Sequence, residues 1–185
     1  MNVTKVVIPA AGFGTRFLPV TKARPKEMMP LLDKPTIQYV VEEAVDSGID
    51  NVLIITGREE QAVERHLDKS YELEEELSAN GKTDRLERVR RNTELAEIHH
   101  VRQQQRQGLV DTVRYARQHA GDEPFALLLG DTIIESGTPC TGTIIQYANE
   151  HETSVVSPER VPWDEVSKYG VVDLGGGSVD ACFPV

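Results

Sequence analysis

Short apolar runs alternate with stretches of helical periodicity along this chain. Runs near residues 3, 52, 98, 125 and 153 predict strands. The run VLIIT at residues 52–56 is apolar at consecutive positions, which is typical of a strand buried on both faces of a parallel sheet. Because helical stretches separate the runs, the pattern predicts an α/β fold with a mostly parallel sheet and helices on both faces.

The helical stretches differ in polarity. Pro35 suits the first turn of a helix, and apolar residues then recur at helical spacing until Gly48. Residues 68–97 are rich in Glu, Arg and Lys, which predicts exposed helices around a turn at residues 80–81. Residues 144–148 predict another helix. The charged stretch indicates a solvated surface rather than a partner site.

The first apolar run leads into a loop of small and basic residues. Pro9 lacks a backbone donor and should end the hydrogen-bonding ladder of the strand. Arg16 offers a rigid fork of donors, while Lys22 and Lys26 offer mobile charges. Residues with little or no side chain let a ligand reach the main-chain N–H groups, and here they are Ala10, Ala11, Gly12 and Gly14. The loop therefore predicts a phosphate-binding site.

Two familiar glycine motifs do not describe this loop. A dinucleotide fingerprint needs a third glycine where Phe17 stands. A P-loop needs lysine and a hydroxyl residue where Thr15 and Arg16 follow Gly14. A single Gly-x-Gly is usually only a turn, so the specificity lies in the ordered pattern of glycines, basic residues and prolines across residues 6–35.

Composition limits the class of protein. A chain of 185 residues with 39% hydrophobic and 27% charged residues suits one soluble domain. We expect a cytoplasmic location, because no apolar run reaches the roughly 20 residues that span a bilayer and residues 1–5 lack a signal peptide's apolar region. Cys140 and Cys182 are too far apart to suggest a metal cluster or a disulfide framework.

Charge is distributed unevenly along the chain. The formal net charge of −10 argues against nucleic-acid or membrane partners. Residues 1–34 hold six basic residues against Glu27 and Asp33, so this segment carries +4 while the remainder carries −14. A local cationic site in an acidic protein suits a small phosphorylated ligand.

The loop also carries a family resemblance. The sequence G-x-G-T-R, followed by Pro19, Thr21-Lys22 and PKEMMP at residues 25–30, resembles the signature of sugar-phosphate nucleotidyltransferases, and its ending looks most like their uridylyl-transferring members in bacteria and archaea. The resemblance implies one Rossmann-like domain over residues 1–185, of the nucleotide-diphospho-sugar transferase type. Members of this family continue past residue 185, so we expect the domain to be incomplete at its C-terminus.

The resemblance implies a reaction and its partners. UTP and glucose 1-phosphate would give UDP-glucose and pyrophosphate, with Mg²⁺ as the cofactor. We expect a homo-oligomer. Thymidylyl transfer to glucose 1-phosphate and a nucleotide-binding module with little turnover remain the alternatives.

Phosphate and metal contacts follow from the same resemblance. The loop from Gly12 to Arg16 would cradle the phosphates, and the nucleotide-binding residues of this segment would be Ala10, Ala11, Gly12, Gly14 and Thr15. Arg16 would stabilise departing pyrophosphate, and Lys26 would neutralise charge near the reacting phosphates. Asp131 ends the sequence L-L-G-D after the apolar run FALLL at residues 125–129. By itself Asp131 suits a turn or cap as well as a ligand. The resemblance makes it a magnesium ligand, in keeping with the oxygen ligands that Mg²⁺ prefers.

Two further positions would contact the base. Gln103 follows the apolar run near residue 98, and Gly108 opens a predicted helix. A glutamine amide both donates and accepts, which suits the imide edge of uracil or thymine. The resemblance assigns Gln103 and Gly108 to base recognition, but the family commonly has G-L-G-H or G-L-A where this chain has Val110 and Asp111 after Gly108-Leu109. These two residues therefore leave the base contacts open.

The C-terminal part contributes one candidate. Gly170, in the sequence KYGVV, would contact the sugar according to the resemblance, although this stretch is equally suited to the start of a strand. The glycines at residues 175–177 predict a loose turn, because no helix follows them.

Overall fold

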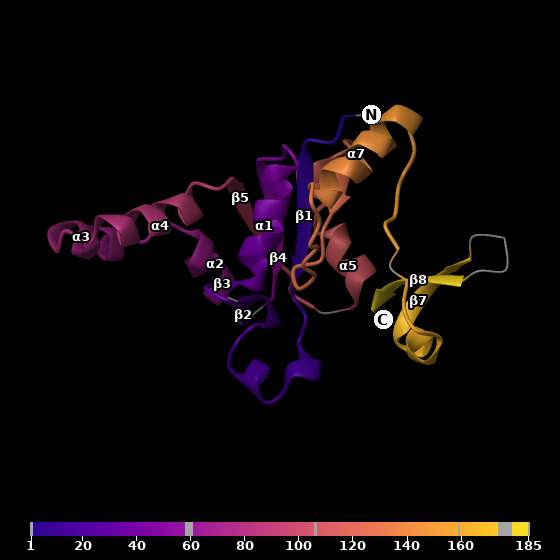
Figure 1. Ribbon diagram of the computed structural model, residues 1–185, viewed down its shortest axis with the longest axis horizontal. Helices are drawn as coiled ribbons and strands as arrows, with labels where there is room; N and C mark the ends of the chain where they lie inside the picture. Colours follow the sequence, from indigo (N-terminus) through magenta and orange to yellow (C-terminus); the bar gives the residue numbers. More distant parts are fainter. Residues whose placement is uncertain (1, 58–60, 106, 159, 174–178, 185) are drawn as a thin grey trace.

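The main sheet has four parallel strands in the order β5-β4-β1-β6 (Figure 1). The computed structural model describes residues 2–57, 61–105, 107–158, 160–173 and 179–184. The four strands are β1 (Lys5–Ala10), β4 (Asn51–Thr56), β5 (Glu97–Arg102) and β6 (Phe125–Leu127). Parallel strands joined through helices were predicted from the apolar runs, and this prediction is confirmed.

Alternate residues of the strands pack into two separate hydrophobic clusters. Val6 and Ile8 pack in one cluster with helix α1 (Thr36–Asp46). Val7 points to the other face and packs in a cluster with Leu53 and Ala116. Successive side chains of a strand point to opposite faces, so an uninterrupted apolar run is what a sheet with two covered faces requires. Helices therefore cover both faces, as predicted.

Helix α1 confirms the periodicity that follows Pro35. Pro35 stands at its N-cap, and the helix buries its apolar stripe against β1 and β4. The buried members of that stripe are Ile37, Val40, Val41 and Ala44. Gly48, with φ 84°, follows the helix, and this backbone conformation favours glycine.

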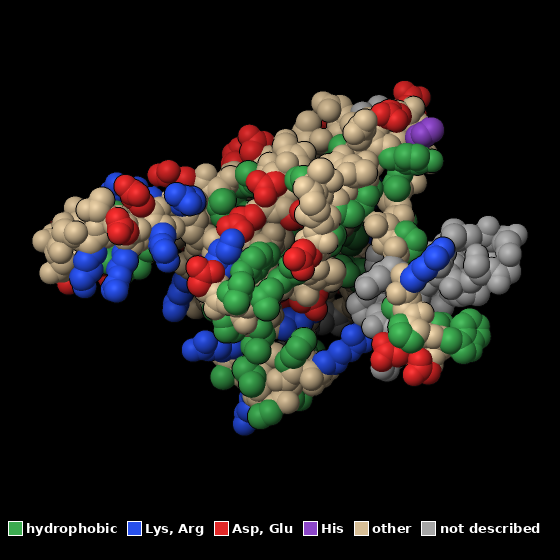
Figure 2. Space-filling model, in the orientation of Figure 1, with side chains coloured by type: hydrophobic (Ala, Val, Ile, Leu, Met, Phe, Trp, Pro, Cys, Tyr) green, Lys and Arg blue, Asp and Glu red, His purple; other side chains and the backbone are tan. Residues whose placement is uncertain are grey.

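The charged stretch forms a helical hairpin that extends away from the sheet (Figure 1). Helix α2 (Gln61–Leu67) precedes it, and the hairpin consists of α3 (Tyr71–Ala79) and α4 (Thr83–Thr93). Figure 2 shows acidic and basic side chains along its surface. Leu77 and Leu86 are its buried apolar residues, so the predicted turn at residues 80–81 joins two largely solvated helices.

The remaining elements are short, apart from one helix. The helices are α5 (Leu109–Arg114), α6 (Arg117–Ala120) and α7 (Cys140–His151), and the 3₁₀ turns are η1 (Thr15–Phe17), η2 (Val20–Lys22), η3 (Lys26–Met28) and η4 (Trp163–Lys168). Two small antiparallel sheets pair β2 (Pro30–Leu31) with β3 (Lys34–Pro35), and β7 (Tyr169–Asp173) with β8 (Val179–Pro184). Helix α7 confirms the prediction for residues 144–148.

Three details differ from the sequence-based expectations. The strand predicted near residue 153 is wrong, because residues 153–157 are mostly exposed and none of the strands that the structure describes pairs with them. Pro9 does not end β1, since the strand runs on to Ala10 and the Pro9 carbonyl still accepts a hydrogen bond from Gly130 N at 3.4 Å. Strand β6 covers only residues 125–127 of the run FALLL. The glycine turn predicted at residues 175–177 lies outside the described residues.

Candidate functional site

Four of the predicted site residues follow the carboxyl ends of strands of the main parallel sheet. Gly12 and Gly14 follow β1, Gln103 follows β5, and Asp131 follows β6. These ends meet at one edge of the sheet, which is where open α/β sheets bind ligands. The fold therefore brings the phosphate, base and metal candidates to a common edge.

The loop after β1 turns back on itself at Gly14. Gly14 has φ 61°, a left-handed conformation that favours glycine. Its carbonyl accepts hydrogen bonds from Phe17 N at 2.9 Å and from Thr21 Oγ1 at 2.7 Å. A Cβ atom on Gly14 would lie 3.0 Å from Thr21 Cγ2 and 3.1 Å from Lys26 Cβ. Glycine is thus required here both by the backbone conformation and by the close approach of η2 and η3.

Lys26 joins this loop to the end of β6. Its Nζ atom donates a hydrogen bond to Asp131 Oδ2 at 2.6 Å, which joins residues 105 positions apart in the sequence. The lysine stem passes beside Gly12, where a Cβ atom would lie 3.1 Å from Lys26 Cε. The missing side chain of Gly12 therefore makes room for Lys26, in addition to leaving main-chain groups accessible.

Glu27 lies next to Lys26 on the buried side of this ion pair, and it was not predicted as a site residue. Its side chain is fully buried, and its Oε1 is 3.9 Å from Lys26 Nζ. Gly130 packs closely against Glu27. A Cβ atom on Gly130 would lie 3.2 Å from Glu27 Cγ and 3.1 Å from Pro9 O. The available sequence signal was an acidic residue within a basic and apolar segment. Two carboxylates thus lie close to one lysine.

The donor set at this place suits a hard divalent cation that is shared with a phosphorylated ligand. The Asp131 side chain is 31% exposed, so solvent reaches the ion pair. Mg²⁺ is often held by one or two carboxylates together with phosphate oxygens of a substrate. Within the described part of the chain there is no group of three or more His, Cys, Asp or Glu residues that could hold a metal. Asp131 therefore fits a magnesium site only if the ligand supplies most of the oxygens.

Gln103 is held by the first turns of α5. Its side chain is buried, and its backbone N donates to Thr56 O at 2.8 Å. The amide Nε2 donates to Asp111 Oδ2 at 3.1 Å, and the amide Oε1 lies 3.2 Å from Thr112 Oγ1. Both ends of the amide thus already have one partner each. The role predicted for Gln103 in base recognition stays a prediction.

Gly108 stands at the N-cap of α5 with φ 90°, a conformation that favours glycine. Helix α5 also contacts β1, which carries the glycine loop at its end. Gly108 and Gln103 thus both contact α5, and α5 in turn contacts the strand that leads into the glycine loop. The predicted helix opening at Gly108-Leu109 is confirmed.

The other predicted residues fall into two groups. Arg16 and Thr15 are exposed on η1, as a role in binding a soluble ligand requires, whereas Ala10 and Ala11 are buried and offer only their main chain to a ligand. Gly170 lies on β7, at an irregularity in its pairing with β8. This two-stranded sheet is separate from the main sheet (Figure 1), so the sheet topology does not join Gly170 to Lys26 and Asp131.

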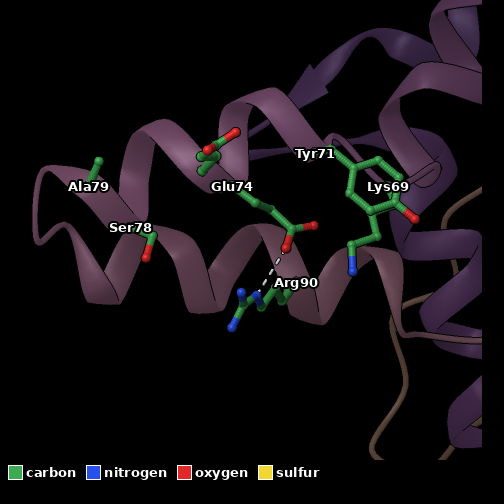
Figure 3. A pocket seen from close by; sticks show the side chains of 7 residues that line it. Lys69, Tyr71, Glu74, Ser78, Ala79 and Arg90 are labelled. Atoms are coloured by element: carbon green, nitrogen blue, oxygen red, sulfur yellow. Dashed lines mark hydrogen bonds and ion pairs between the residues drawn. The ribbon is translucent and has the colours of Figure 1, made fainter.

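A hollow on the α3–α4 hairpin has a different character (Figure 3). Arg90 Nε donates to Glu74 Oε2 at 3.0 Å across it, and Glu74 is nearly buried. The residues that line the hollow are Lys69, Tyr71, Glu74, Glu75, Ser78, Ala79 and Arg90. None of them follows a strand of the main sheet. The ion pair is best explained as holding the two helices of the hairpin together.

Among the residues that the structure describes, none of the helices combines the length and the apolar character needed to cross a bilayer.

Comparison with known proteins identifies relatives for most of the chain. The nucleotidyl transferase family matches residues 5–181. A UTP–glucose-1-phosphate uridylyltransferase of Bacillus subtilis (strain 168) is 48% identical over 172 residues, covering 93% of this chain and 59% of the relative. UTP–glucose-1-phosphate uridylyltransferase 2 of Staphylococcus saprophyticus is 51% identical, covering 93% of this chain and 60% of the relative.

A solved structure also matches. A UTP-bound UGPase from Acinetobacter baumannii superposes with a TM-score of 0.89 at 35% identity, covering 96% of this chain and 63% of that chain. The likeness confirms the fold predicted from the apolar runs and the glycine loop. The chain spans 59% and 60% of the length of the two curated relatives.

Proposed function

The chain belongs to the nucleotidyl transferase family, and on this premise we propose that it carries the nucleotide-binding part of a UTP–glucose-1-phosphate uridylyltransferase. The observation that supports this most is the contact of Lys26 with Asp131 at 2.6 Å beside Gly12. It joins a basic, glycine-bearing loop to a carboxylate at the ligand-binding edge of a parallel sheet. We infer the substrates from the names of the similar proteins.

The proposed reaction is a displacement at phosphorus. A phosphate oxygen of glucose 1-phosphate attacks the α-phosphorus of UTP and forms a new P–O bond. The bond from the α-phosphorus to the oxygen that bridges to the β-phosphate breaks, which gives UDP-glucose and pyrophosphate. No protein nucleophile takes part, so the chain contributes alignment and charge stabilisation.

The residues of the loop have distinct proposed roles. The main-chain N–H groups of residues 12–16 cradle the phosphates, and the exposed Arg16 stabilises the departing pyrophosphate. Lys26 is held near its working position by Asp131, so its charge lies close to the reacting phosphates. Gln103 and Gly108 contact the base, and Gly170 contacts the sugar.

We also propose Mg²⁺ as the cofactor. Asp131 would hold it together with phosphate oxygens of the nucleotide, and the bound ion would offset negative charge on those oxygens. A cation held by Asp131 would compete with Lys26 for this carboxylate, so the Lys26 ammonium would be available to a phosphate oxygen. Assembly into a homo-oligomer and a cytoplasmic location remain predictions.

Calorimetric titration with UTP, with and without Mg²⁺, tests the proposal. We expect Mg²⁺ to strengthen UTP binding to the natural chain and to have little effect in Asp131→Asn, since the amide is a weaker ligand than a carboxylate. Equal magnesium dependence in both proteins would remove Asp131 from the metal site. Absence of UTP binding by the natural chain would contradict the proposed function itself.

A pyrophosphate-release assay with glucose 1-phosphate distinguishes the alternatives. Faster release from UTP than from TTP is expected, because the similar curated proteins are named for UTP. A preference for TTP would favour thymidylyl transfer. UTP binding without release would favour a nucleotide-binding module.

A further inference from the structure

Asp111 determines which way the amide of Gln103 points. The Asp111 carboxylate accepts a hydrogen bond from Gln103 Nε2 at 3.1 Å. An ionised carboxylate has acceptors only. If the amide rotated by half a turn, its Oε1 would face the carboxylate, and two acceptors would be opposed in a largely buried place. Asp111 therefore permits one orientation of the amide.

Thr112, the second partner, does not impose an orientation. Its Oγ1 lies 3.2 Å from Gln103 Oε1 and 3.0 Å from Gly108 O. The hydroxyl has one proton, so it donates to one of these carbonyls at a time. If it donates to Gly108 O, its lone pairs can accept from a rotated Gln103 amide. Of these two partners, only Asp111 determines the orientation of the Gln103 amide.

A fixed amide has a consequence for the base that it reads. After the contacts with α5, Gln103 retains one N–H donor on Nε2 and one lone pair on Oε1. In this orientation Oε1 can accept a hydrogen bond from uracil N3–H, and Nε2 can donate one to a carbonyl of uracil. Cytosine presents an acceptor at N3 and a donor at N4, so it needs the rotated amide. A glutamine free to rotate would accommodate both bases.

We propose that Asp111 is a positioning residue that makes the site reject cytidine nucleotides by holding the Gln103 amide in the orientation that reads uracil. This inference rests on the proposed function, because it needs Gln103 to face the base. Thymine has the same N3 and O4 pattern as uracil. The effect of Asp111 should therefore distinguish UTP from CTP and leave the ratio of UTP to TTP unchanged.

The test compares the dissociation constants of UTP, CTP and TTP for the natural chain, Asp111→Asn and Asp111→Glu. The asparagine amide both donates and accepts, so both orientations of Gln103 become available. We expect UTP binding to stay within about twofold and CTP binding to tighten about tenfold in Asp111→Asn, the factor that corresponds to about one hydrogen bond. Asp111→Glu keeps an acceptor-only group and should keep the rejection of CTP.

Two further variants make the result decisive. Asp111→Ser also both donates and accepts, so it should relax the rejection of CTP if Asp111→Asn is poorly folded. Asp122→Asn removes the same charge at an exposed position of the loop between α6 and β6, and it should leave all three constants unchanged. Thermal unfolding and circular dichroism identify the folded preparations.

The outcomes separate the inference from the function that it builds on. Retained UTP binding with an unchanged ratio of CTP to UTP in Asp111→Asn and Asp111→Ser would overturn the role of Asp111 while leaving the uridylyltransferase proposal intact. An equal loss of affinity for all three nucleotides would also overturn it, since that is the signature of a purely structural role. Failure of the natural chain to bind UTP would overturn both proposals.

Discussion

Gly130 offers a sharp test of the packing beneath the site, because a single methyl group should be felt there. In Gly130→Ala the new Cβ would lie 3.1 Å from Pro9 O, 3.2 Å from Glu27 Cγ and 3.4 Å from Ile8 Cγ2. Two of these contacts are tighter than ordinary van der Waals contact. Pro9 lies in a central strand and Glu27 is fully buried, so neither neighbour can move freely.

The expected cost follows from overpacking. Adding a methyl group to a well-packed interior destabilises a protein by about 1–3 kcal/mol. For a chain of this size each kcal/mol lowers the melting temperature by about 2–4 °C, so Gly130→Ala should melt about 2–12 °C lower. Movement of the main chain at residue 130 should also displace the adjacent Asp131 from Lys26. We therefore expect weaker magnesium-dependent UTP binding in the folded variant.

Gly142→Ala provides the matched control. Gly142 lies in α7, and a Cβ atom there would meet Ser47 at 3.5–3.6 Å, which is ordinary contact. Alanine is favoured over glycine inside a helix by about 0.5–1 kcal/mol, so this variant should melt slightly higher than the natural chain. Thermal unfolding followed by circular dichroism measures both. Equal melting temperatures for Gly130→Ala and the natural chain would refute the packing argument.

The remaining predictions concern charge. Arg16→Ala should weaken UTP binding by about 1.5–3 kcal/mol through loss of a charge-assisted contact and should affect UMP less; equal weakening for both nucleotides in calorimetry would contradict a role at the distal phosphates. Burial lowers the pKa of His66 and of His100 below the ordinary value of 6.5. The unfolded chain therefore binds more protons than the folded one near this pH, and the free energy of unfolding should fall as the pH drops below about 6.5. Urea unfolding at a series of pH values checks this, and His100→Gln should show a smaller fall; an identical fall would exclude His100 as a contributor.

The main sheet could be predicted because its signals are local. Val52 to Ile55 are consecutive apolar residues, and a strand buried on both faces needs that pattern. The strand predicted at residues 153–157 failed because two adjacent valines are only a local preference. A strand also needs a neighbour with which to pair, and the periodicity of a segment does not contain that information.

The site could be predicted only as far as residue types and order. The glycine loop and Asp131 were identified separately, but the contact between Lys26 and Asp131 depends on how β1 and β6 pair. Glu27 could not be predicted, because burial of a charged side chain depends on the tertiary packing around it. The partners of Gln103 depend on tertiary packing in the same way, and in the sequence Asp111 differs from other residues only as a departure from a family pattern.

The hairpin of α3 and α4 bears on how the sheet assembles. Strands β4 and β5 pair in parallel, yet residues 57–96 lie between them in the sequence. Bringing the ends of such a segment together costs chain entropy, and each halving of the effective loop length lowers this cost by about 0.6 kcal/mol. Helices α3 and α4 contact each other, and formation of this local contact shortens the effective loop. The hairpin should therefore accelerate formation of the β4–β5 pair, although its helices extend away from the sheet.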